Sequence, residues 1–116
     1  MDCFNEANVF LFPTMESAGF VVLEAMSYYL PVVALDYGGP KQFVIENRSF
    51  QLVSSDNSIE KIENQLSNNI LELYNNLELR NKIGDANHKT VVENFTWEQK
   101  TKSVLKMYKS LIQNNI

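Results

Sequence analysis

Two glutamates, Glu16 and Glu24, are the residues of this chain best placed to do chemistry, and seven residues lie between them. A carboxylate can accept two hydrogen bonds from neighbouring hydroxyls, as acidic residues do with the ribose of bound dinucleotides. The chain has ten glutamates among 116 residues, so one pair at this spacing is expected by chance. The prediction therefore depends on the residues around the pair.

Those surroundings predict a strand, a loop and the start of a helix. Residues 9–12 are all apolar, as in a buried strand, and Pro13 ends this run. Gly19 precedes residues 20–28, a mostly apolar segment that we expect to be helical. This order puts Glu16 in the loop and Glu24 about one turn into the helix.

The start of that helix is a candidate phosphate site. Unpaired backbone N–H groups and the positive end of the helix dipole favour an anion there. Glu24 would repel a phosphate but suits a ribose diol, whereas Glu16 suits hydroxyls beyond the other end of a diphosphate. Diol, diphosphate and polyol in this order describe a nucleotide sugar. The amides expected to meet the diphosphate are those of Gly19, Phe20, Val21 and Val22.

The motifs of the chain resemble those of a known family, the retaining, nucleotide-sugar-dependent glycosyltransferases of GT-B fold, often called glycosyltransferase group 1. The resemblance covers almost the whole chain. In chain order the matching residues are Pro13-Thr14, Glu16, Gly19, Glu24-Ala25-Met26, Pro31-Val32-Val33-Ala34, Gly38-Gly39 and Phe95-Thr96-Trp97-Glu98.

The resemblance implies a role for each site residue. Glu24 would hold the ribose hydroxyls of the donor, Glu16 would contact the transferred sugar as the catalytic residue, and the amides from Gly19 to Val22 would meet the diphosphate or the sugar. The donor would be a nucleoside diphosphate hexose and the acceptor an unidentified hydroxyl compound. It implies no separate cofactor, retention of configuration, and a role in cell-surface polysaccharide biosynthesis.

The chain departs from the family pattern at four positions. Members usually have glycine, glutamate and glycine where this chain has Tyr29, Gln42 and Phe50, and an aspartate often stands at Asn8. Tyr29 replaces a glycine that suits a left-handed turn at a helix end, so this departure puts the turn in doubt rather than the site. None of the four removes the glutamate pair.

A chain of 116 residues is long enough for one small domain. Because a GT-B enzyme has two Rossmann-like domains around its active site, the resemblance implies that residues 1–116 are a truncated domain, the second half of the C-terminal donor-binding domain. We expect the chain alone not to catalyse transfer. We also expect it to self-associate through the exposed edge of the strand at residues 9–12.

The composition excludes several classes of protein. With 45% hydrophobic and 21% charged residues it is typical of a soluble α/β protein. The net charge of −4, with no cluster of Lys and Arg, argues against a nucleic-acid partner, and the apolar runs are too short for a transmembrane segment. One cysteine, Cys3, permits no internal disulfide, and the N-terminus lacks a signal peptide, so we expect a cytoplasmic location.

Periodicity predicts an α/β fold: a partial Rossmann-like parallel sheet of about three strands, flanking helices and a helical C-terminal tail. We expect strands at residues 9–12, 32–35 and 49–53, and helices at residues 2–6, 20–28 and 41–45.

Three longer helices follow in the second half of the chain. Apolar residues recur every three or four positions from Ile59 to Leu77, after an N-cap at Asn57 or Ser58. A second helix is expected at about residues 79–93. A third opens at Thr96, where a glutamine three residues later completes a capping box.

Other candidates for chemistry are weaker. His88 lies in a predicted surface helix, where a solvated residue is favoured over a base, and Cys3 is interpreted as a small apolar residue. The Gly38-Gly39-Pro40 turn fits a tight connection and a role beside the donor equally well. Asp36 lacks a second carboxylate, and no cluster has metal-ligand spacing, so no metal is implied.

Alternatives to the glycosyltransferase remain open. The chain could be a non-catalytic nucleotide-binding or interaction fragment, or a piece of a GT-B sugar-nucleotide epimerase. It could also be an unrelated parallel α/β signalling domain, although a receiver domain should carry an early acidic cluster that is not present in this sequence.

Overall fold

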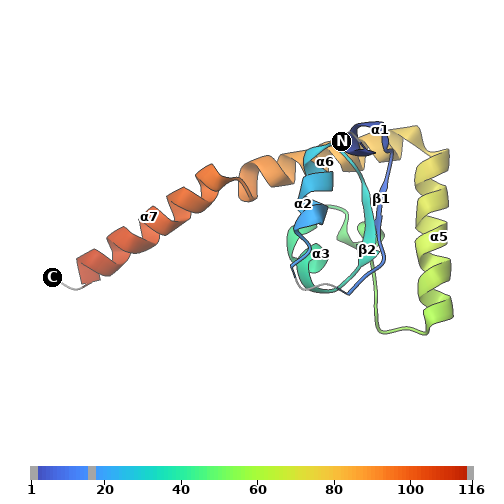
Figure 1. Ribbon diagram of the computed structural model, residues 1–116, viewed down its shortest axis with the longest axis horizontal. Helices are drawn as coiled ribbons and strands as arrows, with labels where there is room; N and C mark the ends of the chain where they lie inside the picture. Colours follow the sequence, from blue (N-terminus) through green and yellow to red (C-terminus); the bar gives the residue numbers. More distant parts are fainter. Residues whose placement is uncertain (1–2, 16–17, 115–116) are drawn as a thin grey trace.

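The computed structural model describes residues 3–15 and 18–114. The predicted α/β class is confirmed, with a three-stranded parallel sheet, flanking helices and a helical C-terminal tail (Figure 1). The elements are α1 (Cys3–Glu6), β1 (Phe10–Phe12), α2 (Phe20–Ser27), β2 (Val32–Leu35), α3 (Gly38–Phe43), α4 (Arg48–Gln51), β3 (Leu52–Val53), α5 (Ile59–Asn75), α6 (Leu77–Asn94) and α7 (Trp97–Asn114).

The strands lie in the order β1-β2-β3, and both pairings are parallel. The central strand β2 is buried at all four positions. Because successive side chains of a strand point to opposite faces, Val32 and Ala34 enter one apolar core and Val33 enters another. The sheet is therefore covered on both faces, as the apolar strands predicted.

Helices from distant parts of the chain form these two cores. On one face, β1 and β2 pack with α2 and α3, and on the other β2 packs with α5. Helix α6 contributes to both cores, since Ile83 joins the core under α5 while Val91 packs against the core under α2. The end of α6 nearest α7 thus lies on the same face of the sheet as α2.

Side chains cap the three long helices. Ser58 Oγ accepts a hydrogen bond from Lys61 N at 3.3 Å, and Thr96 Oγ1 accepts one from Gln99 N at 3.3 Å. Asn76 Oδ1 accepts from Leu79 N at 3.0 Å and so starts α6 two residues earlier than predicted. The predicted caps at Ser58 and Thr96 are confirmed.

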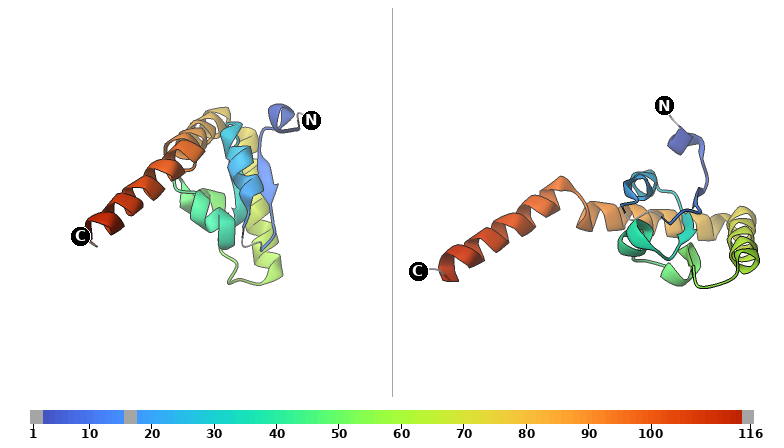
Figure 2. Two further views of the ribbon diagram at one scale, coloured as in Figure 1. Left: turned by 60° about the vertical axis from the view of Figure 1, so that its left-hand side comes forward. Right: turned by 60° about the horizontal axis from the view of Figure 1, so that its bottom comes forward.

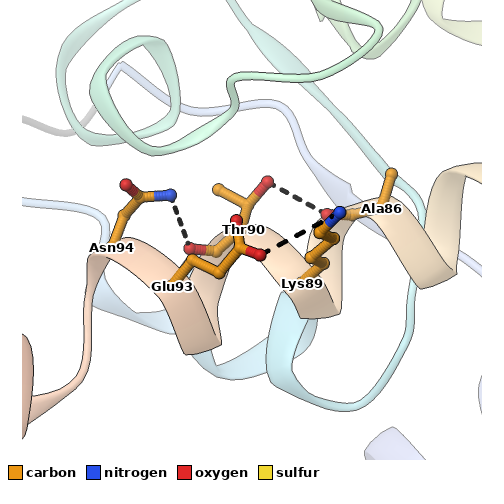
Figure 3. Close-up of polar contacts among 5 residues, drawn as sticks. All are labelled: Ala86, Lys89, Thr90, Glu93 and Asn94. Carbon is orange, nitrogen blue, oxygen red and sulfur yellow. Dashed lines mark hydrogen bonds and ion pairs between the residues drawn. The ribbon is translucent and has the colours of Figure 1, made fainter.

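The last turns of α6 are held by its own side chains (Figure 3). Thr90 Oγ1 donates to the carbonyl of Ala86 at 3.0 Å, and Asn94 Nδ2 donates to the carbonyl of Thr90 at 3.1 Å. Lys89 Nζ lies 3.9 Å from Glu93 Oε1 on the exposed side. These contacts stabilise the last turns of α6, which ends at Asn94, two residues before Thr96, the cap of α7.

Helix α7 extends away from the other elements, and the three views in Figures 1 and 2 agree on this. One face of this helix is apolar, but the described residues leave it exposed, and Trp97 is 83% exposed. Its other exposed apolar residues are Val104, Leu105, Met107, Tyr108, Leu111 and Ile112.

Two short elements correct the prediction. The strand expected at residues 49–53 is wrong in its first part, because α4 occupies Arg48–Gln51 and β3 has only Leu52 and Val53. Asn47, at φ 52°, accepts from the N–H groups of Phe50 and Gln51 and closes a helical turn instead. Helix α3 begins at Gly38, three residues before its predicted start.

A buried polar network explains why Gln51 is helical. Its Oε1 accepts from Val32 N at 2.8 Å and from Asn87 Nδ2 at 2.7 Å, while its Nε2 donates to Asn87 Oδ1 at 3.0 Å and to the Glu46 carbonyl. Asn87 Nδ2 also donates to the Leu30 carbonyl at 2.9 Å. The network joins α4, α6 and the start of β2, and each of its amide groups is paired as buried polar groups require.

Strand β1 forms one edge of the sheet, because among the described residues it pairs only with β2. Leu11 on this strand is exposed. Self-association through this edge stays a prediction, and light scattering on the purified chain at two concentrations tests it.

Candidate functional site

The candidate site lies where β1 and β2 end and α2 begins. Parallel strands have their carboxyl ends at one edge of the sheet, and ligands of open α/β sheets bind there. Residues 13–15 follow β1, residues 36–37 follow β2, and α2 starts at Phe20. The structure thus brings the predicted loop and helix start to the edge of the sheet that suits a ligand.

Only one of the two glutamates, Glu24, lies within the described residues. Glu16 lies outside the described residues, between Met15 and Ala18 in the sequence. Glu24 is on α2, one turn after Phe20, and is exposed. Its carbonyl accepts a hydrogen bond from Ser27 Oγ at 2.6 Å, so this contact leaves the carboxylate unused.

The start of α2 is built around Gly19. Its φ of 61° is left-handed, which glycine adopts without a steric cost, and it has no side chain that could cap the helix. The N–H of Val22 donates to the Gly19 carbonyl at 3.0 Å, and the Val22 side chain is fully buried. Of the predicted amides, those of Phe20 and Val21 therefore remain the best placed to meet an anion, because the first amides of a helix have no acceptor within it.

The opposite end of α2 contains the tyrosine that departs from the family pattern. Tyr29 takes a left-handed φ of 62°, and Tyr29 N donates to the Met26 carbonyl while Leu30 N donates to that of Ala25. These two bonds form a Schellman motif, which usually has glycine in this place. The turn therefore keeps the geometry that a glycine would give it.

His88 contributes to this turn rather than to the site. Its ring stacks on Tyr29 with the centroids 3.9 Å apart, and its Nδ1 lies 3.0 Å from the Ser27 carbonyl. The residue is half-buried, so the expectation of a solvated histidine is wrong. Stacking and a hydrogen bond, in the tautomer with a proton on Nδ1, give it a structural role.

Sequence reasoning gave no role to Asp36, which directly follows β2 at the candidate edge. Its Oδ1 is buried and has no hydrogen-bond partner among the described residues, although Arg48 Nη2 lies 4.0 Å away. The available signal was an acidic residue immediately after a buried strand. Among the described residues no group of three potential metal ligands comes together, and Cys3 is exposed on α1.

A groove beside the start of α2 was also missed. It has a volume of about 540 Å³ and lies between α2, α3 and the junction of α6 with α7. Phe43 stacks on Phe20 at 6.0 Å and meets Phe95 edge-on at 5.3 Å. Trp97 and Lys100 line its outer side. Its aromatic residues are spread from position 20 to position 97, so no local motif indicates it.

No helix in the described part of the chain is long and apolar enough to cross a membrane. No solved structure matches the chain.

Comparison with known proteins connects this geometry to one family. The chain is 36% identical over 96 residues to an uncharacterised glycosyltransferase of Methanocaldococcus jannaschii, covering 83% of this chain and 26% of the relative. It is 32% identical over 107 residues to an alpha-maltose-1-phosphate synthase of Mycolicibacterium smegmatis, covering 90% of this chain and 28% of that enzyme.

A sucrose synthase of Melioribacter roseus is 34% identical over 106 residues, which are 87% of this chain and 13% of that protein. The chain thus spans about a quarter or less of the length of these three relatives. The family model described as glycosyl transferases group 1 matches residues 1–90, which include both glutamates and the whole candidate site. The chain belongs to the glycosyl transferases group 1 family.

Proposed function

We propose that this chain is the donor-binding part of a retaining glycosyltransferase that moves a hexose from a nucleoside diphosphate sugar to a hydroxyl acceptor. The observation that carries the proposal is the start of α2, where Gly19 provides no side-chain cap, at the carboxyl edge of a parallel sheet within a chain of this family. The alpha-maltose-1-phosphate synthase and sucrose synthase among its relatives support a sugar substrate.

In this proposal the diphosphate lies against the amides of Phe20 and Val21. These amides and the helix dipole stabilise the negative charge that grows on the leaving diphosphate. Glu24, one turn further along α2, accepts two hydrogen bonds from the ribose diol. Glu16 orients the transferred sugar.

The chain's role in transfer is mainly to position the donor. The acceptor oxygen bonds to the anomeric carbon on the face that the diphosphate leaves, which retains the configuration, and the hydroxyl proton of the acceptor passes to the departing diphosphate oxygen. We assign no base among the residues of this chain. The cytoplasmic location and the role in cell-surface polysaccharide biosynthesis stay predictions.

The test is an NMR titration of the ¹⁵N-labelled chain with UDP, GDP and ADP, followed by the matching nucleoside diphosphate glucoses. Glu24→Gln should weaken binding of the preferred nucleoside diphosphate about 10- to 150-fold, because it loses a charge-assisted hydrogen bond to the ribose. Glu72→Gln, an exposed glutamate on α5, is the matched control and should bind as the unaltered chain does.

Glu16→Gln separates the two glutamates. Its affinity for the nucleoside diphosphate should stay within about twofold, whereas its affinity for the intact nucleotide sugar should fall by about tenfold, the effect of losing one good hydrogen bond. Unchanged binding by Glu24→Gln, or equal losses of nucleoside diphosphate affinity in both variants, would contradict this division of roles.

A non-catalytic binding fragment is the second candidate function, because the start of α2 and the exposed Glu24 could bind a nucleotide without any transfer. Neither function predicts that the chain alone transfers a sugar, and a transfer assay on the purified chain tests this shared expectation. Multiple turnovers by the chain alone would show that it contains more of the active site than we propose.

A further inference from the structure

The first turn of α3, Gly38-Gly39-Pro40, follows β2 and touches the backbone at the start of α2. A Cβ atom built on Gly39 would lie 2.2 Å from the Ala18 carbonyl oxygen and 2.8 Å from Gly19 Cα. A Cβ on Gly19 would in turn lie 3.0 Å from Pro40 Cδ and 3.1 Å from Gly39 Cα. Two stretches of backbone, twenty residues apart in sequence, therefore pack directly against each other with no room for a side chain.

This contact lies immediately before the amides assigned to the diphosphate. The residues it fixes, Ala18 and Gly19, precede Phe20 and Val21 on α2. Gly19 and Gly39 are both buried, and Gly19 has the left-handed φ that directs the chain into the helix. A shift of the Ala18 carbonyl would therefore turn the first amides of α2.

The turn itself is fixed by the core. Pro40 is fully buried, and Phe43 on the same short helix belongs to the core that α2 covers. Tyr37 N donates to the Leu35 carbonyl at 2.8 Å, which joins the turn to the end of β2. The sheet thus sets the place of Gly39, and Gly39 sets the place of the α2 start.

We propose that Gly39 is a positioning residue of the donor site: its missing side chain lets the Gly38-Gly39-Pro40 turn hold the Ala18–Gly19 backbone so that the first amides of α2 point at the diphosphate. The identity of the ligand rests on the proposed function, whereas the contact between Gly39 and the Ala18–Gly19 backbone is independent of it. It assigns a specific role to the turn whose sequence fitted a tight connection and a role beside the donor equally well.

The chain offers a matched control in Gly84. A Cβ there would also meet a carbonyl oxygen at 2.2 Å, that of Tyr29 at the opposite end of α2. Gly84→Ala and Gly39→Ala therefore introduce the same methyl group against the same kind of atom. Only Gly39→Ala introduces it beside the proposed site.

The experiment compares both variants by ¹H–¹⁵N NMR and by titration with UDP, GDP and ADP. Gly39→Ala should move the amide resonances of Ala18 to Val21 and weaken binding of the preferred nucleoside diphosphate by about tenfold or more, since small displacements of positioning groups have effects of this size. Gly84→Ala should lower the melting temperature, but leave those resonances in place and the affinity within about twofold of the original.

If Gly39→Ala fails to fold, Pro40→Ala replaces it. That variant removes the ring beside Gly19 without adding a clash, and it should move the Gly19 and Phe20 resonances and weaken binding about two- to fivefold. Unmoved Ala18 to Val21 resonances in the folded variant would overturn the proposal, and so would equal losses of affinity in Gly39→Ala and Gly84→Ala. If none of the three nucleotides binds the unaltered chain, the proposed function fails, while the resonances alone still decide the role of Gly39.

Discussion

The two ends of α2 have the same backbone conformation at their boundaries but opposite surroundings. Gly19 at the start and Tyr29 after the end have φ values of 61° and 62°. At the Tyr29 end, side chains of α6 fill the space: His88 stacks on the tyrosine ring and Asn87 donates to the Leu30 carbonyl. At the Gly19 end a Cβ on the glycine would meet the Pro40 ring and the Gly39 backbone, and Phe20 stacks on Phe43 of α3.

This difference indicates where the molecule is free to bind something. The carbonyls at the C-terminal end of α2 are used by the Schellman bonds and by α6, so that end has a structural role. Gly19 provides no side-chain cap at the start of the helix, and among the described residues the close Gly39 contact holds this start in place without occupying its amides. A helix start held in this way suits an anion.

The largest effect is predicted for the Tyr29 end of α2, where side chains of α6 fill the space. Gln51→Ala removes the partner of Val32 N and of both amide atoms of Asn87, and so loosens the residue that binds the Leu30 carbonyl. Since each buried group left unpaired costs about 1–3 kcal/mol, the free energy of unfolding should fall by about 3 kcal/mol or more. Urea denaturation measures it.

Gln113→Ala, at an exposed glutamine of α7, is the control and should change the free energy of unfolding by less than about 0.5 kcal/mol. A loss below about 1 kcal/mol for Gln51→Ala would show that water replaces the network and that the Tyr29 end of α2 does not depend on it.

The second effect concerns the stability of the Gly19 end of α2. Gly19→Ala introduces a left-handed alanine, which costs about 1–2 kcal/mol, and puts its Cβ 3.0 Å from Pro40 Cδ. The free energy of unfolding should fall by about 2 kcal/mol, as measured by thermal denaturation. Gly19→Asn should lose less, because asparagine tolerates this conformation. Equal losses in the two variants would assign the whole effect to the contact with Pro40.

The sequence predicted the main elements of the fold because their signals are local. Strand β2 is a short run of apolar residues, and α5 has apolar residues at helical spacing after Ser58, its N-cap. The failure at residues 49–51 has a non-local cause. Phe50, Leu52 and Val53 fit a strand, but Gln51 bonds to Val32 and Asn87, which are 19 and 36 residues away.

The candidate site was predictable in its sequence but not in its packing. Gly19 and the helix after it were visible as a turn and a helix start, and the structure has both. The contact of Gly39 with Ala18 was not visible, because it depends on β1 and β2 being neighbours in the sheet. Nor could the sequence show that His88 would stack on Tyr29, since that requires α6 to lie along α2.

A third, smaller effect measures how Tyr29 is accommodated. In a double-mutant cycle of Tyr29→Asn and His88→Ala, the coupling free energy should be about 0.5–1.5 kcal/mol, the usual size for a pair of stacked rings. Asparagine keeps the left-handed turn and removes the ring, so the cycle isolates the stack from the backbone. Thermal denaturation of the four proteins gives the coupling, and a value near zero would show that the turn needs no support from α6.

The smallest effect is expected for Leu105→Ala on α7, because the apolar face of this helix lies outside the two cores. Leu105 is 55% exposed, whereas Leu73 on α5 is fully buried. Leu73→Ala should cost about 2–5 kcal/mol in free energy of unfolding, because it leaves a cavity. Leu105→Ala should cost less than about 0.5 kcal/mol, because its side chain loses little contact and alanine favours a helix. Urea denaturation at two protein concentrations compares them.

A cost above about 1 kcal/mol for Leu105→Ala that grows with protein concentration would show that a second copy covers α7 in solution. The same cost without any concentration dependence would show that α7 folds back onto its own chain.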